Sequence, residues 1–192
     1  MKPRFLVALC TALLTAGTHI GISGTALAHS MPYEEATLIL SMDEQTTLVP
    51  CESTIGDAKA AAIRAGLDTD GAEHDSIGGN QRMAGYSCGV YRYSFSCDTD
   101  AGDTRPVPDL PITGYRITGY RIAGDALHTR AGFAVGTLYT AVTAAYGEAS
   151  RVEQNEPYIL TYCYEFEERG ARLLFDVDDD GIIRAILFRS NR

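Results

Sequence analysis

The chain reads ARLLFDVDDDGIIRAILFR over residues 171–189. In its first half, hydrophobic residues fall at every second position, which is the period of a β-strand; they are Ala171, Leu173, Phe175 and Val177. The sequence Asp178-Asp179-Asp180-Gly181 is typical of a tight turn, and residues 182–189 return as a second strand. This stretch therefore predicts an antiparallel hairpin at the end of a larger sheet.

Two alanine-rich segments predict short amphipathic helices earlier in the chain. Each begins with a similar tripeptide, Ile55-Gly56-Asp57 or Val135-Gly136-Thr137, whose last residue is a favourable N-cap. Apolar residues then recur at the spacing of one helical face: Ala58, Ala61, Ala62 and Ala65 in the first segment, and Leu138, Ala141, Val142 and Ala145 in the second. Gly66 and Gly147 are expected to end the two helices.

Aromatic strands extend this similarity. Residues 91–95 and 162–166 both alternate aromatic with other side chains and both follow a predicted helix. Together these features predict an α+β chain of two similar helix-plus-antiparallel-sheet units, at about residues 46–123 and 124–192, within one domain over 29–192. The glycine-rich residues 68–85 and the proline-rich residues 98–111 are predicted to be irregular loops.

The first 28 residues have the features of a secretory signal peptide. Lys2 and Arg4 precede an apolar run over residues 5–16, and Ala26-Leu27-Ala28 is a small-x-small cleavage site. Cleavage there would make His29 the first residue of a protein located in the periplasm or outside the cell. The apolar run is too short to span a bilayer, and we expect neither a membrane span nor a lipid anchor.

Four cysteines follow the leader: Cys51, Cys88, Cys97 and Cys163. An even number in an oxidising compartment predicts two disulfides, which allows three connectivities. A strand between Cys88 and Cys97 would hold these two apart, so that the pairing Cys51–Cys97 with Cys88–Cys163 is favoured.

The charge of the chain limits its partners. It has 25 acidic and 16 basic residues, for a net charge of −9, and two of the basic residues belong to the leader. A protein this acidic repels phosphate backbones, so that nucleic acid is excluded as a partner. Another protein, of cationic character, is the expected partner.

The second predicted unit resembles a known family. The matching residues are Leu127-x-Thr129-x-x-Gly132-x-x-Val135-Gly136-Thr137, then Val142-x-x-x-Tyr146-Gly147, and the late turn Asp180-Gly181. This pattern, over about residues 127–189, is similar to the helix-plus-sheet module of β-lactamase inhibitory protein and of BamE-type (SmpA/OmlA-like) outer-membrane lipoproteins. The resemblance implies a binding or scaffold role rather than catalysis, and it transfers no functional residue.

Two sets of residues have the chemistry of a metal site. Asp176, Asp178 and Asp180 fit the opening of a calcium loop, although the twelfth position is Leu187 instead of a glutamate. His29, as a free amino terminus, would chelate copper through its amine and imidazole, with His74 or His128 as a further ligand.

Tyrosine and arginine are the residues most typical of a protein interface. The chain has 11 tyrosines and no tryptophan. A partner-binding sheet surface is predicted from six of its residues: Tyr115, Arg116, Tyr120, Arg121, Tyr162 and Tyr164. No nucleophile motif is present, so that catalysis is not expected. The sequence predicts an exported binding protein without a cofactor. The alternatives are a calcium or copper protein and, third, a small hydrolase.

Overall fold

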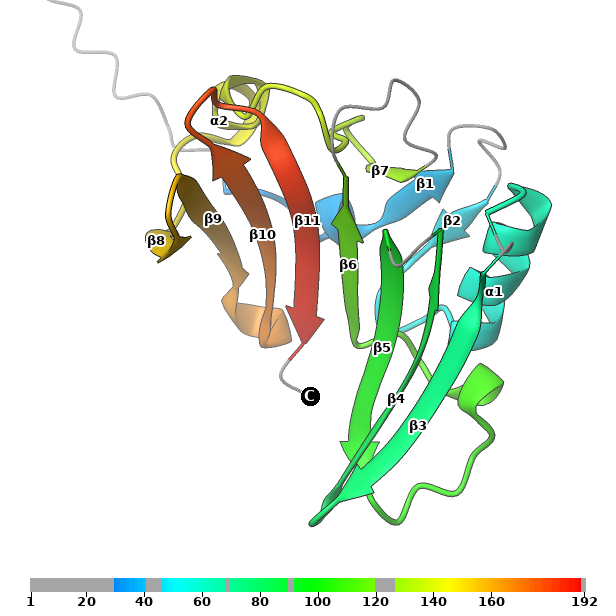
Figure 1. Cartoon of the computed structure of the whole chain (residues 1–192). Helices are drawn as coiled ribbons and strands as arrows, with labels where there is room; N and C mark the ends of the chain where they lie inside the picture. Colours follow the sequence, from blue (N-terminus) through cyan, green and yellow to red (C-terminus); the bar gives the residue numbers. More distant parts are fainter. Residues whose placement is uncertain (1–29, 41–45, 68–69, 90–91, 120–126, 191–192) are drawn as a thin grey trace, which may run out of the picture.

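The computed structural model describes residues 30–40, 46–67, 70–89, 92–119 and 127–190. Eight antiparallel strands form one large sheet; they are β3 (Ala72–Gly78), β4 (Gln81–Cys88), β5 (Tyr93–Asp100), β6 (Gly114–Thr118), β8 (Arg151–Glu156), β9 (Ile159–Phe166), β10 (Ala171–Asp178) and β11 (Ile183–Ser190). Their order in the sheet is β3-β4-β5-β6-β11-β10-β9-β8 (Figure 1). Two four-stranded meanders therefore meet where β6 pairs with β11.

A second layer lies behind this sheet in the view of Figure 1. It contains a small sheet of β1 (Leu38–Leu40), β2 (Thr47–Leu48) and β7 (Leu127–Thr129), and two helices, α1 (Ile55–Arg64) and α2 (Thr140–Tyr146). Three 3-10 turns complete the described elements: η1 (Tyr33–Ala36), η2 (Val107–Asp109) and η3 (Glu167–Arg169). Within the described residues, no helix has the length and apolar character needed to cross a membrane.

The predicted C-terminal hairpin is confirmed. Strands β10 and β11 pair with Leu173 opposite Phe188 and Phe175 opposite Ile186, and all four side chains are fully buried. The turn closes through a hydrogen bond from the Gly181 amide to the Asp178 carbonyl, 3.0 Å long. Gly181 has a φ of 76°, a conformation that glycine adopts without steric cost.

Helix α1 is also confirmed, with a different start from the predicted one. Thr54 is the N-cap, and Asp57 lies at the third helical position, where its carboxylate accepts a 2.8 Å hydrogen bond from the Thr54 amide. The Thr54 hydroxyl in turn accepts from the Asp57 amide, which completes a capping box. In α2 the N-cap is Tyr139 instead of Thr137, and Val142 is its only buried residue.

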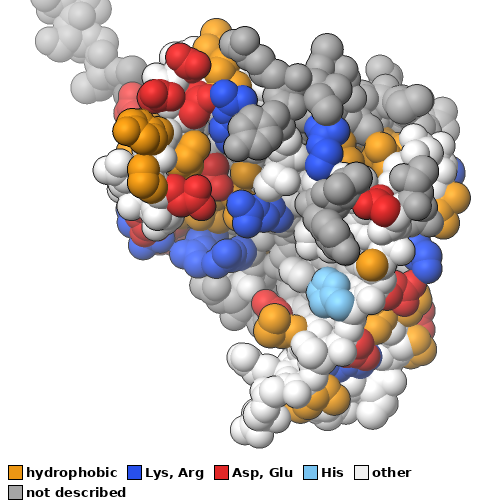
Figure 2. Space-filling view, viewed as in Figure 1, with side chains coloured by type: hydrophobic (Ala, Val, Ile, Leu, Met, Phe, Trp, Pro, Cys, Tyr) orange, Lys and Arg blue, Asp and Glu red, His pale blue; other side chains and the backbone are white. Residues whose placement is uncertain are grey.

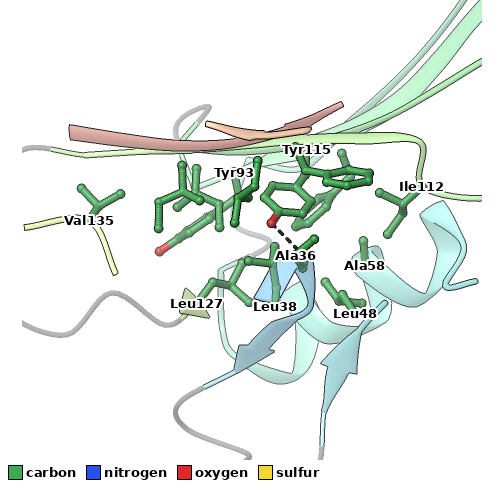
Figure 3. Packing of buried hydrophobic residues seen from close by; sticks show 14 of the residues in the cluster. Ala36, Leu38, Leu48, Ala58, Tyr93, Ile112, Tyr115, Leu127 and Val135 are labelled. Atoms are coloured by element: carbon green, nitrogen blue, oxygen red, sulfur yellow. Dashed lines mark hydrogen bonds between the residues drawn. The ribbon is translucent and has the colours of Figure 1, made fainter. Parts of the chain in front are cut away.

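The core lies between the two layers, as the side chains in Figure 3 show. Aromatic residues from the large sheet face the small sheet and α1, and they include Tyr93, Phe95, Tyr115 and Phe188. Tyr115 stacks on Phe188 with ring centroids 5.6 Å apart. Its hydroxyl donates a 2.9 Å hydrogen bond to the carbonyl of Ala36, at the end of η1 (Figure 3). This bond ties the second layer to the middle of the large sheet.

The expected α+β architecture of two similar helix-plus-sheet units is wrong. Antiparallel strands make up most of the regular secondary structure among the described residues, and the described α-helices are two short ones. The aromatic segments that suggested a repeat also occupy different places, because residues 93–95 belong to the third strand of their meander and residues 162–166 to the second strand of theirs. Similar side-chain alternation therefore arose in strands that are not equivalent.

The described part of residues 68–85 is not the predicted irregular loop. Residues 72–78 and 81–88 form the paired strands β3 and β4. Every residue of β3 is exposed, so that this strand lacks the alternation of buried and exposed side chains from which strands are predicted.

The predicted disulfides are wrong as well. None of the cysteines at positions 51, 88, 97 and 163 is within bonding distance of another. Cys88 lies on β4 and Cys163 on β9, five strand spacings apart, which corresponds to about 24 Å. A disulfide needs Cα atoms within about 7 Å. Cys51 lies in the turn after β2, where its sulfur is 3.9 Å from the Tyr33 hydroxyl, and Cys97 is buried on β5. The two meanders of the large sheet are instead joined by the pairing of β6 with β11 and by the shared core.

Candidate functional site

The large sheet has one face that no described element of the second layer covers, and we call it the outer face. Its side chains are those that alternate with the core residues along each strand. On the strands in the middle of the sheet they are Arg116 (β6), Ala185, Leu187 and Arg189 (β11), and Arg172, Leu174 and Asp176 (β10). Figure 1 looks onto this face, with α1 and the small sheet behind it.

Three arginines lie close together on the outer face. Arg172 and Arg189 are directly opposite each other on β10 and β11. Arg116 is opposite Leu187, two residues from Arg189 on the same face. Arg116 and Arg189 are exposed and Arg172 is half-buried. We call these three residues the arginine cluster.

An apolar strip, largely buried, runs beside the arginine cluster. Leu187, Leu174 and Cys163 are successive partners across β11, β10 and β9. Leu174 and Cys163 are buried, with 9% and 0% exposure, yet neither belongs to the core cluster between the layers. Burial also raises the pKa of the Cys163 thiol, which disfavours its reactive thiolate form.

The electrostatics of the arginine cluster are unusual. Like charges placed directly opposite each other across two strands destabilise a sheet, and Arg172 faces Arg189 in this way. None of the three arginines forms an ion pair with a described residue. The Nε of Arg172 is buried without a hydrogen-bond partner among the described residues. The cluster therefore retains unsatisfied positive charge and donor capacity on a strongly acidic chain.

Acidic groups on this face lie at the sides of the cluster. Glu165 is opposite Arg172 on β9, and Asp176 accepts a 2.7 Å hydrogen bond from the Thr161 hydroxyl. Figure 2 shows basic side chains gathered across the middle of the face, with acidic ones mainly toward its rims.

The structure separates the residues that were predicted to bind a partner. Tyr115 and Tyr164 are buried, with 4% and 3% exposure, and therefore cannot contact a partner in this conformation. The Tyr164 hydroxyl is 2.9 Å from the Tyr139 hydroxyl and donates to the Gly147 carbonyl. Tyr162 is half-buried and stacks on Tyr139. Arg116 is exposed on the outer face, while Tyr120 and Arg121 lie outside the described residues.

The predicted calcium ligands do not converge on one point. Asp176 is hydrogen-bonded to Thr161. Asp178 accepts hydrogen bonds from the amides of Asp180 and Ile182 and forms an ion pair with Arg184. The carboxylates of Asp178, Asp179 and Asp180 do lie within 4.8 Å of one another, but Asp178 stabilises the turn and its positive neighbour opposes a cation. Calcium binding stays a prediction.

Copper binding through His29 falls on a residue outside the described ones. The two further ligands considered for it lie on different sheets: His74 on β3 of the large sheet and His128 on β7 of the small one. The Nδ1 of His128 is 2.7 Å from the Thr129 carbonyl oxygen, so that one of its nitrogens is already engaged. The copper site also stays a prediction.

A polar hollow of about 350 Å³ lies between β2 and α1. Its charged residues are already engaged, because Asp57 caps α1 and Arg64 donates to the Thr46 hydroxyl. The outer face is therefore the better candidate for binding.

Sequence reasoning missed Arg172, Arg189 and Leu187. The alternation that predicted a core face on residues 171–177 also assigns residues 172, 174 and 176 to the opposite face. Arg172 could have been placed on that face. Its position opposite Arg189 depends on the register of the hairpin, which includes a bulge between Asp176 and Val177.

Comparison with known proteins finds similarity at the level of a solved structure. No protein-family model matches the chain, and no curated protein matches it. A solved structure of a DUF4309 family protein (YjgB) from Bacillus subtilis subsp. subtilis str. 168 is similar, with a TM-score of 0.41 and 17% sequence identity. The similarity covers 75% of this chain and 82% of that one. The resemblance of residues 127–189 to the inhibitory-protein module stays a prediction.

Proposed function

We propose that this chain is an exported binding protein, and that the outer face of its large sheet binds an acidic segment of another protein. The observation that carries the proposal is the arginine cluster, in which Arg172 lies directly opposite Arg189 and the buried Arg172 Nε has no hydrogen-bond partner among the described residues. Export rests on the leader in the sequence. Catalysis and a resident cofactor form no part of the proposal.

The chemistry of the cluster favours carboxylates. A guanidinium group presents its donors in a planar fork that matches a carboxylate, and each such charge-assisted pair is stronger than a neutral hydrogen bond. A carboxylate between Arg172 and Arg189 would offset their mutual repulsion and would give the Arg172 Nε an acceptor. The half-buried Leu187 beside Arg116 supplies apolar contact next to these polar groups.

This proposal changes the expected partner. Net charge predicted a cationic one, because the chain as a whole is negative. Net charge governs long-range approach, whereas a bound partner contacts one local surface. On the outer face, Arg116, Arg172 and Arg189 lie on the three strands in the middle of the sheet, and the acidic Asp176 on one of these strands is hydrogen-bonded to Thr161. An acidic segment therefore fits this surface. The negative net charge of the chain would repel such a segment at long range, and salt would weaken that repulsion.

The experiment uses a fluorescein-labelled decaglutamate peptide, with binding followed by fluorescence anisotropy. The test variant is Arg116→Glu/Arg189→Glu, and the matched control is Arg64→Glu/Arg130→Glu. All four positions are exposed, and both double variants change the net charge equally. Arg64 lies on α1 and Arg130 follows β7, away from the outer face.

We expect the wild-type protein and the control to bind the peptide and the test variant to bind at least about tenfold more weakly, because two charge-assisted pairs are lost. A second readout is the stability of Arg189→Gln, which should equal or exceed that of the wild type because one member of the opposed pair is removed. The proposal fails if the peptide does not bind, or if both double variants lose the same affinity.

A further inference from the structure

Strand β8 leaves one edge of the large sheet open. It is the last strand in the sheet order, and five of its six residues are exposed. An open edge presents unpaired backbone groups that can pair with another strand. Natural edges are protected by charged side chains, especially lysine, by proline, by β-bulges or by charges that point inward. Residues 151–156 contain neither lysine nor proline, their bulge lies at the far end of the strand between Gln154 and Glu156, and the inward-pointing Val152 is apolar and 50% exposed.

The pairing of β8 with β9 decides which backbone groups face outward. The Glu165 amide donates to the Ser150 hydroxyl, and the Asp178 amide donates to the Ile182 carbonyl. Backbone N–H and C=O groups alternate in direction along a strand, so that residues two apart direct them to the same neighbour. The first bond therefore places the backbone groups of Cys163 and Thr161, like those of Glu165, on the side of β8. The second bond directs the backbone groups of Asp178 and Asp176 toward β11 and those of Val177 toward Leu160 on β9, which gives the same result for Thr161. Arg151 and Glu153, the partners of Cys163 and Thr161, therefore use their backbone groups within the sheet, and those of Val152 and Gln154 face the open edge.

The sequence of β8 is complementary to itself in one of the registers that this geometry permits. If two antiparallel copies meet with Val152 opposite Val152, then Arg151 of each copy lies opposite Glu153 of the other. The two Val152 residues would exchange both backbone hydrogen bonds. The Arg151–Glu153 positions would be non-hydrogen-bonded pairs, in which the side chains approach most closely. A register centred on Glu153 would instead place two carboxylates together.

We propose that two copies of this chain associate through their β8 strands, in the register centred on Val152, to form a continuous sheet across a twofold axis. The inward side of the contact would be apolar, because Val152 is opposite Tyr162 on β9 and Leu160 is 40% exposed beside it. The bulge between Gln154 and Glu156 ends the regular strand, which limits pairing to about residues 150–154. The inference is independent of the acidic partner proposed above.

The opposite edge of the sheet does not offer the same contact. Strand β3 carries Glu73 and Asp75 on one face, and the same antiparallel arrangement centred on His74 would place these acids opposite each other. Glu73 and Asp75 form ion pairs with Lys59 and Arg82 within the chain, whereas Arg151 and Glu153 pair with each other, 2.9 Å apart, so that two copies in the register centred on Val152 would bring four alternating charges together. The charges of the two edges therefore favour a closed twofold dimer through β8 over an open filament that would also use β3.

Charge exchange at the proposed contact tests this inference. Arg151→Glu and Glu153→Arg each place like charges together across the axis, whereas the double variant Arg151→Glu/Glu153→Arg restores opposite charges. The control is Arg130→Glu, an exposed position that follows β7 and matches the charge change of Arg151→Glu. Sedimentation velocity would follow association over about 10–500 µM, because edge pairing buries a small area and is expected to be weak.

The wild-type protein, the double variant and the control should form dimers. Each single variant should associate about tenfold more weakly, since both symmetry-related pairs change. A mixture of the two single variants should regain the dimer, because the two glutamates at positions 151 and 153 of one chain then face arginines of the other. A wild-type protein that is monomeric over the whole range would overturn the proposal. A dimer equally strong in every variant would also overturn it, by placing the contact elsewhere.

Discussion

The Tyr115 hydroxyl is the contact through which the link between the two layers can be measured. Tyr115→Phe removes only the oxygen that donates to Ala36, and it leaves the ring that stacks on Phe188. A buried neutral hydrogen bond contributes about 1 kcal/mol, and a buried acceptor left without a partner costs about 1–3 kcal/mol. Ala36 is 0% exposed. We therefore expect the free energy of unfolding to fall by about 1–3 kcal/mol.

Urea unfolding followed by circular dichroism measures this loss as a lower midpoint at an unchanged m-value. Tyr158→Phe is the matched control, because Tyr158 is 76% exposed and its change should leave the midpoint unaltered. Burial holds the pKa of Tyr115 well above its ordinary value, so that the hydroxyl stays protonated and the loss should be the same at about pH 6 and pH 9. If Tyr115→Phe and Tyr158→Phe unfold at the same urea concentration, the hydroxyl does not stabilise the contact between the layers.

Three further predictions concern stability. Thr54→Ala should lower the free energy of unfolding by about 1 kcal/mol in the same urea assay, because the capping box of α1 is lost; an unchanged value would show that the cap is dispensable. Leu173→Ala should cost about 2–5 kcal/mol because Leu173 is fully buried, whereas Leu160→Ala, at a 40% exposed position on the same face of the sheet, should cost much less; equal losses would contradict the difference in burial between the two positions. The hydrogen bonds from Arg82 hold the pKa of Asp75 below its ordinary value, so that the contribution of this carboxylate is present above about pH 4 and is lost as the pH falls through the lowered pKa. Asp75→Asn should therefore flatten the acid side of a plot of melting temperature between about pH 7 and pH 2.5, and an unaltered slope would show that this pair does not contribute.

The sequence predicted elements best where one face of an element is buried. In the hairpin of β10 and β11, alternation follows directly from burial of one face against the core, and the turn at Gly181 requires a positive φ. Helix α1 was predicted from four alanines, of which Ala58, Ala61 and Ala62 are buried and Ala65 is half-buried. Strand β3 was missed because exposure on both faces leaves no periodic signal.

Neighbours in space were not predictable in the same way. The tyrosines were assigned to a partner surface by residue type, but the parity of their strands places Tyr115 and Tyr164 against the core. The favoured disulfides were chosen from separations along the chain, whereas the distance between Cys88 and Cys163 is set by the number of strands between β4 and β9.

By itself, the sequence determined the local periodicities of the C-terminal hairpin and of α1, the turn at Gly181 and the acidic composition, because each depends on residues close together in the chain. Only the tertiary structure decided which strands are neighbours and in which register they pair. That step placed Arg172 opposite Arg189 and left β8 at an open edge. The physical reason is that pairing between distant strands depends on the packing of the whole core, to which every strand contributes at once.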